Sequence, residues 1–279
     1  MPLELMFITN DPRVAKIAET SGVNRIWIDL ETLGKEERQK NMNTVKSHHS
    51  VEDIARVKAV LSNAELLVRV NPWNGGSAEE IEQVISAGAD RIMLPMWETA
   101  EQANMFLKAV GGRVKTTLLL ETDRAARCVD EVLNNPLLDE IHIGLNDLHL
   151  SRGLTFMFEL LSDGTVEALC AKFKKAGIKY GFGGIARIGE GTLPAEKIVT
   201  EHYRLGSTRA ILSRSFCNVE EISSLQEIER IFTENMKTLR EFEKKAEAFS
   251  AEEFEQNVAE VKLGVEKIVK VIKEKKANG

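Results

Sequence analysis

The sequence has few of the residues that mark secreted or membrane proteins. Its 279 residues contain only three cysteines, Cys128, Cys170 and Cys217, and their odd number and wide spacing fit neither a disulfide framework nor a CxxC metal site. No apolar run approaches the ~20 residues needed to span a bilayer, and the N-terminus lacks the basic start of a secretion signal. We therefore expect a cytoplasmic protein with idle thiols and no membrane partner.

The sequence also lacks an excess of basic residues. It has 37 Lys and Arg against 43 Asp and Glu, a net charge of -6, whereas nucleic-acid-binding domains usually carry clustered basic residues. We therefore predict no nucleic-acid partner, and any anionic ligand must be bound by a local site. The 43% hydrophobic and 29% charged fractions are typical of a globular protein. The length suits one large domain.

A short sequence motif recurs along the chain: a small residue, a glycine, a few polar positions and then an apolar run. The glycines are Gly22, Gly88, Gly112, Gly177 and Gly206. This motif is typical of a helix that ends at a left-handed glycine and is followed by a buried strand. With three further apolar runs, it predicts strands within residues 3–10, 26–31, 65–71, 92–97, 116–121, 140–147, 180–185 and 210–215.

Helix-start signals lie between these expected strands. Asp11 and Pro12 suit an N-cap and first helical residue, and Ser77 and Thr99 each precede an acid or amide by three residues, the capping-box spacing. Eight apolar strands alternating with helices predict an α/β fold, a (β/α)8 TIM barrel over residues 1–218. An open doubly wound sheet is the alternative, which we disfavour because no G-x-G-x-x-G follows the first strand.

The pattern changes after residue 219 to continuous helix with a break near Phe249 and Ser250. The eighth barrel helix needs only part of residues 219–279, and apolar positions such as Val261 and Val265 have nothing left to cover on their own barrel. We therefore predict a C-terminal helical extension that packs against other subunits of a homo-oligomer. A solvated, lysine-rich tail is the alternative for residues 273–279.

Barrel enzymes carry their working residues at the carboxyl ends of the strands. In this sequence those ends carry Asp29, Glu31, Arg69, Asn71, Pro95, Glu121, Asn146, Asp147, Gly183, Gly184, Ser213 and Arg214. Glu121 and Asp147 each follow an apolar run, where an unpaired carboxylate would be costly to desolvate. A hard divalent cation, Mg²⁺ or Mn²⁺ with Co²⁺ as a substitute, would remove that cost. Helix capping or pairing with an arginine is the alternative.

Other strand ends suggest anion binding. Arg69 lies in the apolar run LLVRV, so a buried guanidinium there suits a carboxylate or enolate. Gly183 and Gly184 could form a backbone cradle for an anion, although tight turns alone also need glycine. His48 and His49 either contact substrate or lie in a solvated loop. No lysine occupies a strand end where it could form a Schiff base, which favours a metal-dependent route.

Several of these segments match a known family in order along the chain. The matching pieces lie at 28–31 (IDLE), 68–69 (VR), 94–96 (LPM), 99–103 (TAEQA), 120–122 (LET) and 143–148 (IGLNDL). Together they extend from about Phe7 to Cys217, and in this order the chain resembles the HpcH/HpaI aldolase/citrate lyase family. The likeness departs from the aldolase branch at Thr32, where that branch has His, and at Leu119, where it has Gln. The acyl-CoA lyase branch favours Lys where this chain has Met96.

The resemblance implies roles for the site residues. It implies that Glu121 and Asp147 hold Mg²⁺ or Mn²⁺, that Arg69 stabilises the oxyanion of a pyruvate-type enolate, and that backbone at Gly144, Leu145 and Asn146 receives the substrate carboxylate. Asp29 and Glu31 belong to the same site. It further implies a trimer or hexamer in which the C-terminal helices exchange between neighbours.

These observations favour one function over two rivals. We expect metal-dependent cleavage of a small 4-hydroxy-2-oxo acid into pyruvate, or a close relative, and an aldehyde. A metal-bound water, or His48 or His49 in place of the missing His, would move the proton. The rivals are a citrate or acyl-CoA type of cleavage and a non-catalytic barrel that binds a 2-oxo acid.

Overall fold

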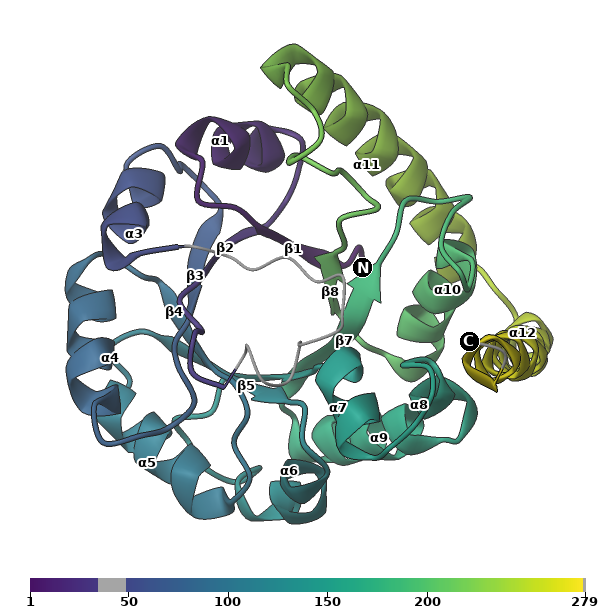
Figure 1. Cartoon of the computed structure of the whole chain (residues 1–279), viewed down its shortest axis with the longest axis horizontal. Helices are drawn as coiled ribbons and strands as arrows, with labels where there is room; N and C mark the ends of the chain where they lie inside the picture. Colours follow the sequence, from purple (N-terminus) through teal and green to yellow (C-terminus); the bar gives the residue numbers. More distant parts are fainter. Residues whose placement is uncertain (35–48, 278–279) are drawn as a thin grey trace.

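The computed structural model describes residues 1–34 and 49–277. Eight parallel strands form a closed barrel in chain order (Figure 1), as the sequence predicts. They are β1 (Glu4–Ile8), β2 (Arg25–Asp29), β3 (Glu65–Arg69), β4 (Arg91–Leu94), β5 (Lys115–Leu120), β6 (Glu140–Ile143), β7 (Lys179–Ile185) and β8 (Arg209–Leu212). The (β/α)8 barrel is confirmed.

Helices surround the barrel on all sides in Figure 1. They are α1 (Pro12–Thr20), α3 (Val51–Lys58), α4 (Ser77–Ser86), α5 (Ala100–Val110), α6 (Asp123–Cys128), the 3-10 turn η1 (Val129–Glu131), α7 (Leu145–Ser151), α8 (Glu159–Ser162), α9 (Thr165–Ala176), α10 (Ala195–Leu205), α11 (Leu225–Glu247) and α12 (Ala251–Ala277). The helix α11 packs against α1 and α10 and so closes the outer ring as its eighth helix.

The local signals are confirmed with two exceptions. The recurring glycines all have positive φ, and the side chains of Asp11 and Thr99 cap α1 and α5. Ser77, in contrast, is the first residue of α4, and Gly76 is the N-cap. The expected strand over 140–147 is also too long, because β6 ends at Ile143 and α7 begins at Leu145. Asp147 therefore lies on a helix.

The barrel interior is layered along its axis, because alternate residues of each strand point inward. An apolar middle layer contains Met6, Trp27, Leu67, Met93 and Leu119. On β2, β3 and β5, the inward residue two positions further along the chain is Asp29, Arg69 and Glu121 respectively. The polar residues of the candidate site therefore lie on a packed apolar floor at the carboxyl ends of the strands.

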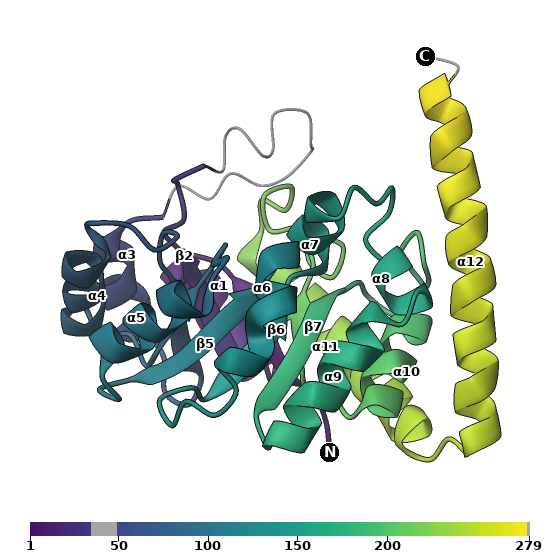
Figure 2. The ribbon, with the colours of Figure 1, turned by 90° about the horizontal axis from the view of Figure 1, so that it is seen from below.

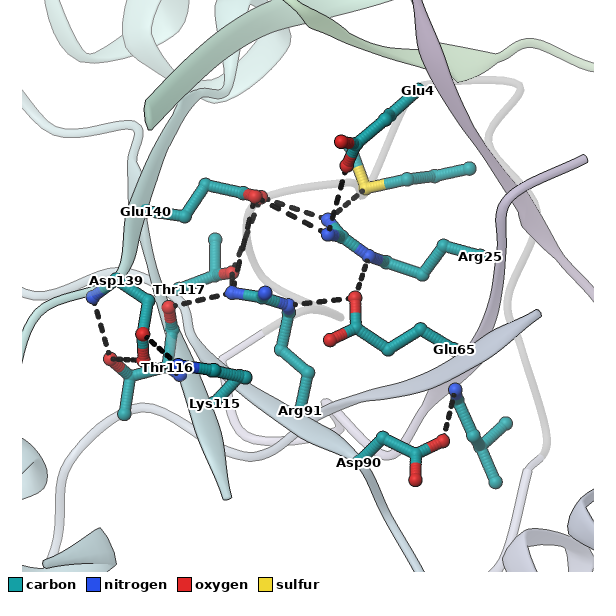
Figure 3. Close-up of polar contacts among 12 residues, drawn as sticks. Glu4, Arg25, Glu65, Asp90, Arg91, Lys115, Thr116, Thr117, Asp139 and Glu140 are labelled. Carbon is teal, nitrogen blue, oxygen red and sulfur yellow. Dashed lines mark hydrogen bonds and ion pairs between the residues drawn. The ribbon is translucent and has the colours of Figure 1, made fainter. Parts of the chain in front are cut away.

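An ionic layer closes the opposite, amino-terminal end of the barrel (Figure 3). Glu140 on β6 accepts from Arg25 Nη1 at 2.8 Å and from Arg209 Nε at 2.7 Å. Glu65 accepts from Arg25 Nε at 2.6 Å and from Arg91 Nε at 3.0 Å. Burial would raise the pKa of Glu140, but the charges of Arg25 and Arg91 prevail and lower it to about 2. This layer stabilises the barrel rather than its site.

We expect Glu140→Gln to lower the free energy of unfolding by about 3 to 5 kcal/mol, because it leaves buried guanidinium groups without their carboxylate. The folded-state pKa of Glu140 lies below its ordinary value of 4.5. The stability that ionised Glu140 gives the folded protein is therefore present above about pH 4.5 and is lost as the pH falls toward 2. Urea unfolding at pH 7 and pH 3 measures both effects. Glu82→Gln, which alters an exposed pair with Arg113, is the control, and an equal change in both variants would contradict the prediction.

The helix α12 stands upright beside the barrel and extends past the end that carries α7 (Figure 2). It packs against α8 and α10 of its own chain, where Val261 and Val265 are buried. The expectation that such residues have nothing to cover on their own barrel is therefore wrong. Leu263 and Val271 remain exposed, at 56% and 49%. Neither α12 nor any other helix in the described part of the chain is long and apolar enough to cross a membrane.

Candidate active site

Arg69 is fixed at the carboxyl end of β3 by two carboxylates. Its Nε and Nη2 donate to the two carboxylate oxygens of Asp29 at 2.8 and 2.9 Å, and Nη2 lies 3.2 Å from Glu31 Oε2. Burial alone would lower the pKa of Arg69, but the charges of Asp29 and Glu31 raise it above its ordinary value. The guanidinium is therefore a permanent positive charge in a preorganised, bidentate geometry.

Asp147 lies close enough to Glu121 to affect the ionisation of Glu121. Glu121 follows β5 and is 3% exposed, and its Oε1 accepts from the backbone N–H of Met96 at 3.0 Å. Burial raises the pKa of Glu121 well above its ordinary value, and the charge of Asp147 adds to this effect. Arg69 acts in the opposite direction, while Glu31 raises the pKa further. The site thus gathers more negative charge than Arg69 alone can balance.

Two backbone features shape the surroundings of Glu121. A Cβ on Gly144 would lie 2.8 Å from Glu121 Oε2 and 2.9 Å from its Cβ, so only glycine lets the start of α7 approach this carboxylate. Met96, which follows Pro95, has φ of 51°, an uncommon conformation for a residue with a side chain. Such strain at a functional position is kept where the surrounding contacts require it, and here it directs the Met96 N–H at Glu121.

The residues present fit a hard divalent cation. Glu121 and Asp147 offer oxygen ligands, which suit Mg²⁺ or Mn²⁺. Burial raises the pKa of Glu121 and the charge of Asp147 adds to this effect, and a bound cation would offset both. Across residues 1–34 and 49–277, no group of three or more His, Cys, Asp or Glu is arranged to hold a metal. A pair of carboxylates leaves coordination positions for water and substrate, as magnesium sites commonly do.

His49 lies beside Asp29, whereas His48 falls outside the described residues. The backbone N–H of Asp29 donates to His49 Nδ1 at 2.9 Å. Thr32 has a structural partner, since its backbone N–H and its hydroxyl donate to Asn71 Oδ1 at 2.9 and 3.3 Å. Thr32 stands at the position where the aldolase branch has His, and it anchors the chain after β2. A different histidine, His49, lies beside Asp29.

A cavity of about 420 Å³ adjoins Arg69 and Asp29. Besides these two residues and His49, its lining comes from the ends of β1 and β8 and the segments after them: Phe7, Ile8, Thr9, Asn10, Asp11, Val14, Ile211, Leu212, Ser213, Arg214, Cys217, Asn218, Val219 and Glu220. Burial raises the pKa of Cys217 to about 11, so its thiol stays protonated near neutral pH. All three cysteines are free, in agreement with the sequence analysis.

The glycines expected to cradle an anion have a role within β7. Pairing between β7 and β8 is irregular between Gly181 and Gly184. Gly183 has φ of 53°, and a Cβ on it would lie 2.7 Å from Leu145 Cδ1. Its carbonyl oxygen also lies 3.2 Å from His142 Nε2. These contacts explain Gly183 without a ligand, and the lining of the cavity contains neither Gly183 nor Gly184. Anion binding by this pair stays a prediction.

Trp27 is a site residue that the sequence pattern alone did not single out. Its indole lies below Arg69, with the guanidinium carbon 5.0 Å from the ring centroid. The available signal was the two-residue spacing between Trp27 and Asp29 on one strand, which places both side chains on the inner face. The partnership with Arg69 depends on strand register, because Asp29 is paired directly with Arg69 across β2 and β3.

The fold and site define a class: a (β/α)8 barrel with a buried acidic site at the carboxyl ends of its strands, as in barrel enzymes. The family model for HpcH/HpaI aldolase/citrate lyase matches residues 4–179. The chain therefore belongs to the HpcH/HpaI aldolase/citrate lyase family, a family of lyases and aldolases. Aldolases of this family are generally dependent on a divalent metal.

Solved structures support the fold. A family protein from Burkholderia cenocepacia J2315 is 16% identical with a TM-score of 0.59, over 81% of this chain and 95% of that one. The HpcH/HpaI aldolase from Desulfitobacterium hafniense DCB-2 is 14% identical with a TM-score of 0.56, over 86% and 93%. RipC from Yersinia pestis is 16% identical with a TM-score of 0.56, over 90% and 97%. At these identities the likeness shows the fold alone. No curated protein sequence matches the chain.

Proposed function

We propose that this protein is a metal-dependent carbon–carbon lyase that cleaves a 4-hydroxy-2-oxo acid into a pyruvate-type 2-oxo acid and an aldehyde, and catalyses the reverse addition. One observation carries the proposal: the buried carboxylate of Glu121 lies within electrostatic range both of Asp147 and of the clamped guanidinium of Arg69. Such an arrangement joins a cation site to a fixed positive charge, the combination that stabilises an enolate.

Each group has a defined task in this scheme. Glu121 and Asp147 would hold Mg²⁺ or Mn²⁺, which when bound supplies positive charge to the carboxylate and 2-oxo group of the substrate. As the C3–C4 bond breaks, the 4-hydroxyl would lose its proton to solvent water and become the aldehyde carbonyl. The electron pair of the broken bond moves toward the 2-oxo oxygen, where Arg69 shares the developing negative charge, and C3 of the enolate then takes a proton from solvent water. The first turn of α7, at Leu145 and Asn146, would offer backbone N–H groups to the substrate carboxylate.

The contacts of His49 suggest a role other than proton transfer. A ring nitrogen that accepts from a backbone N–H carries a lone pair, so the neutral ring bears its proton on Nε2. Nδ1 of His49 accepts in this way from Asp29, so the neutral ring carries its N–H on Nε2. A neutral histidine used in this manner is known from triosephosphate isomerase. We propose that His49 donates to the 4-oxygen of the substrate and does not act as the base.

Paired substitutions distinguish these two roles. We expect His49→Ala to lower kcat by about 100-fold, the scale for loss of an oxyanion donor. His49→Gln keeps an N–H donor and should recover most of that loss, because its amide cannot exchange protons near neutral pH. Steady-state kinetics across pH 5–9 provide the measurement. If His49→Gln is as slow as His49→Ala, and the native rate falls at acid pH while the rates of both variants do not, His49 is a base instead.

The cavity beside Arg69 provides space for the second product or reactant. It begins at Asp29, Arg69 and His49 and continues toward Ser213 and Asn218, so an aldehyde released from C4 could occupy it. Incubation with 4-hydroxy-2-oxo acids and coupled detection of pyruvate tests the activity. Turnover of acyl-CoA or citrate-type substrates without release of pyruvate would support the citrate lyase alternative, and binding without turnover would support a non-catalytic barrel.

We also propose a homo-oligomer, a trimer or hexamer, built partly by α12. Val258, Leu263 and Val271 on this helix are at least 37% exposed, although its lower part packs on its own chain. Exposed apolar side chains along one helix favour a subunit contact. Sedimentation of the full chain and of a chain that ends at Phe249 would show whether α12 contributes to assembly.

A further inference from the structure

Trp27 lies directly beneath the guanidinium of Arg69. The indole is 2% exposed and belongs to the apolar middle layer with Met6, Leu67, Met93 and Leu119. The Arg69 guanidinium carbon is 5.0 Å from the ring centroid, within the range of a cation–π interaction. Arg69 is thus bordered by carboxylates along one edge and by an aromatic face below.

The indole N–H of Trp27 is not used by the fold. Its Nε1 is buried and has no hydrogen-bond partner in the described part of the chain. A buried donor left without a partner destabilises a protein, so a smaller apolar side chain would avoid this penalty. What the indole offers that an aliphatic side chain does not is the negative electrostatic potential of its ring face.

The contacts of Arg69 leave one end of the guanidinium for substrate. Nε and Nη2 are occupied by Asp29 and Glu31, while Nη1 makes no hydrogen bond to a described residue. Two carboxylates at one edge fix the position of that edge but allow the guanidinium plane to tilt about it. A ring face below the plane removes this freedom and so sets the direction of Nη1.

We propose that Trp27 is a positioning residue, whose ring face orients the Arg69 guanidinium so that Nη1 is directed at the oxyanion of the enolate. This inference rests on the proposed lyase function for its catalytic consequence. The electrostatic contact itself does not depend on that function and is tested separately below.

The kinetic test compares Trp27→Phe with Trp27→Leu. Both substitutions leave a smaller apolar side chain, Leu more so than Phe, but only phenylalanine keeps an aromatic face, and the Arg69→Ala background below separates this difference in size from the contact with Arg69. We expect Trp27→Leu to lower kcat by about 10-fold or more with little change in KM, because misorientation of a group that acts mainly in the transition state affects kcat. Trp27→Phe should recover most of this loss. Met93→Ala, another cavity in the same layer, controls for packing. Equal rates in the two Trp27 variants would overturn the proposal.

The second test repeats the pair in an Arg69→Ala background. If Trp27 acts through Arg69, the kinetic difference between Trp27→Phe and Trp27→Leu disappears once the guanidinium is gone. A difference that persists at the same size would show that the ring acts by packing alone and would overturn the proposal.

Thermal unfolding of the same four proteins, without metal or substrate, provides a readout independent of activity. The melting temperature of Trp27→Phe should exceed that of Trp27→Leu when Arg69 is present, and this gap should shrink when Arg69 is absent. A difference in melting temperature that is the same with and without Arg69 would contradict a stabilising contact between Trp27 and Arg69. If the native protein cleaves no hydroxy-oxo acid but the gap depends on Arg69, the lyase function fails while the contact between Trp27 and Arg69 stands.

Discussion

Arg69→Ala is expected to lower kcat by at least about 100-fold, the scale for removal of a preorganised charge stabiliser. The guanidinium is held by both oxygens of Asp29 and lies above Trp27, so its charge is fixed in place before substrate binds. Arg69→Lys keeps the charge but cannot reproduce the bidentate contact, and its rate should lie between those of the native protein and Arg69→Ala.

The measurement is a steady-state rate per folded protein, with near-UV circular dichroism as the check on folding. Loss of Arg69 leaves Asp29 and Glu31 buried without their cation, so some loss of stability is expected along with the loss of rate. Arg113→Ala, which removes an exposed arginine far from the site, serves as the control. A native rate in Arg69→Ala would mean that this arginine is structural and that the enolate is stabilised elsewhere.

Chelation of divalent metals is expected to abolish activity altogether. EDTA should remove it, and Mg²⁺, Mn²⁺ or Co²⁺ should restore it in the native protein. Glu121→Gln and Asp147→Asn keep the shape of each side chain while removing a charged ligand, so both variants should fold and remain inactive after metal is added. Activity that survives chelation, or a pyruvate adduct trapped on lysine by borohydride, would exclude this route.

The barrel could be predicted because its signals are local. A left-handed glycine at the end of a helix, followed by an apolar run, marks the start of five of the eight strands within a few residues, and Gly22 and Gly88 show the positive φ that this pattern requires. The boundary after β6 was misplaced for a local reason as well. Leu145 and Leu148 are buried helix residues, but in sequence they continue the apolar run of the strand.

The candidate site could be predicted only as a set of strand ends. Contact between Asp29 and Arg69 needs the register of β2 against β3, which residues 40 positions apart do not reveal. The place of His49 depends on the path of the chain after β2, and the role of Thr32 depends on Asn71 from the next strand. For α12, apolar periodicity revealed a buried face but not which surface buries it.

Binding of Mn²⁺ to the purified, metal-stripped protein tests the central claim most directly, because it requires no knowledge of the substrate. Isothermal titration of the native chain should show about one Mn²⁺ bound per chain, and this binding should be lost in Glu121→Gln and in Asp147→Asn, whereas Glu82→Gln should bind as the native chain does. Undiminished Mn²⁺ binding in both site variants, or none in the native chain, would contradict the assignment of Glu121 and Asp147 as the metal-holding pair.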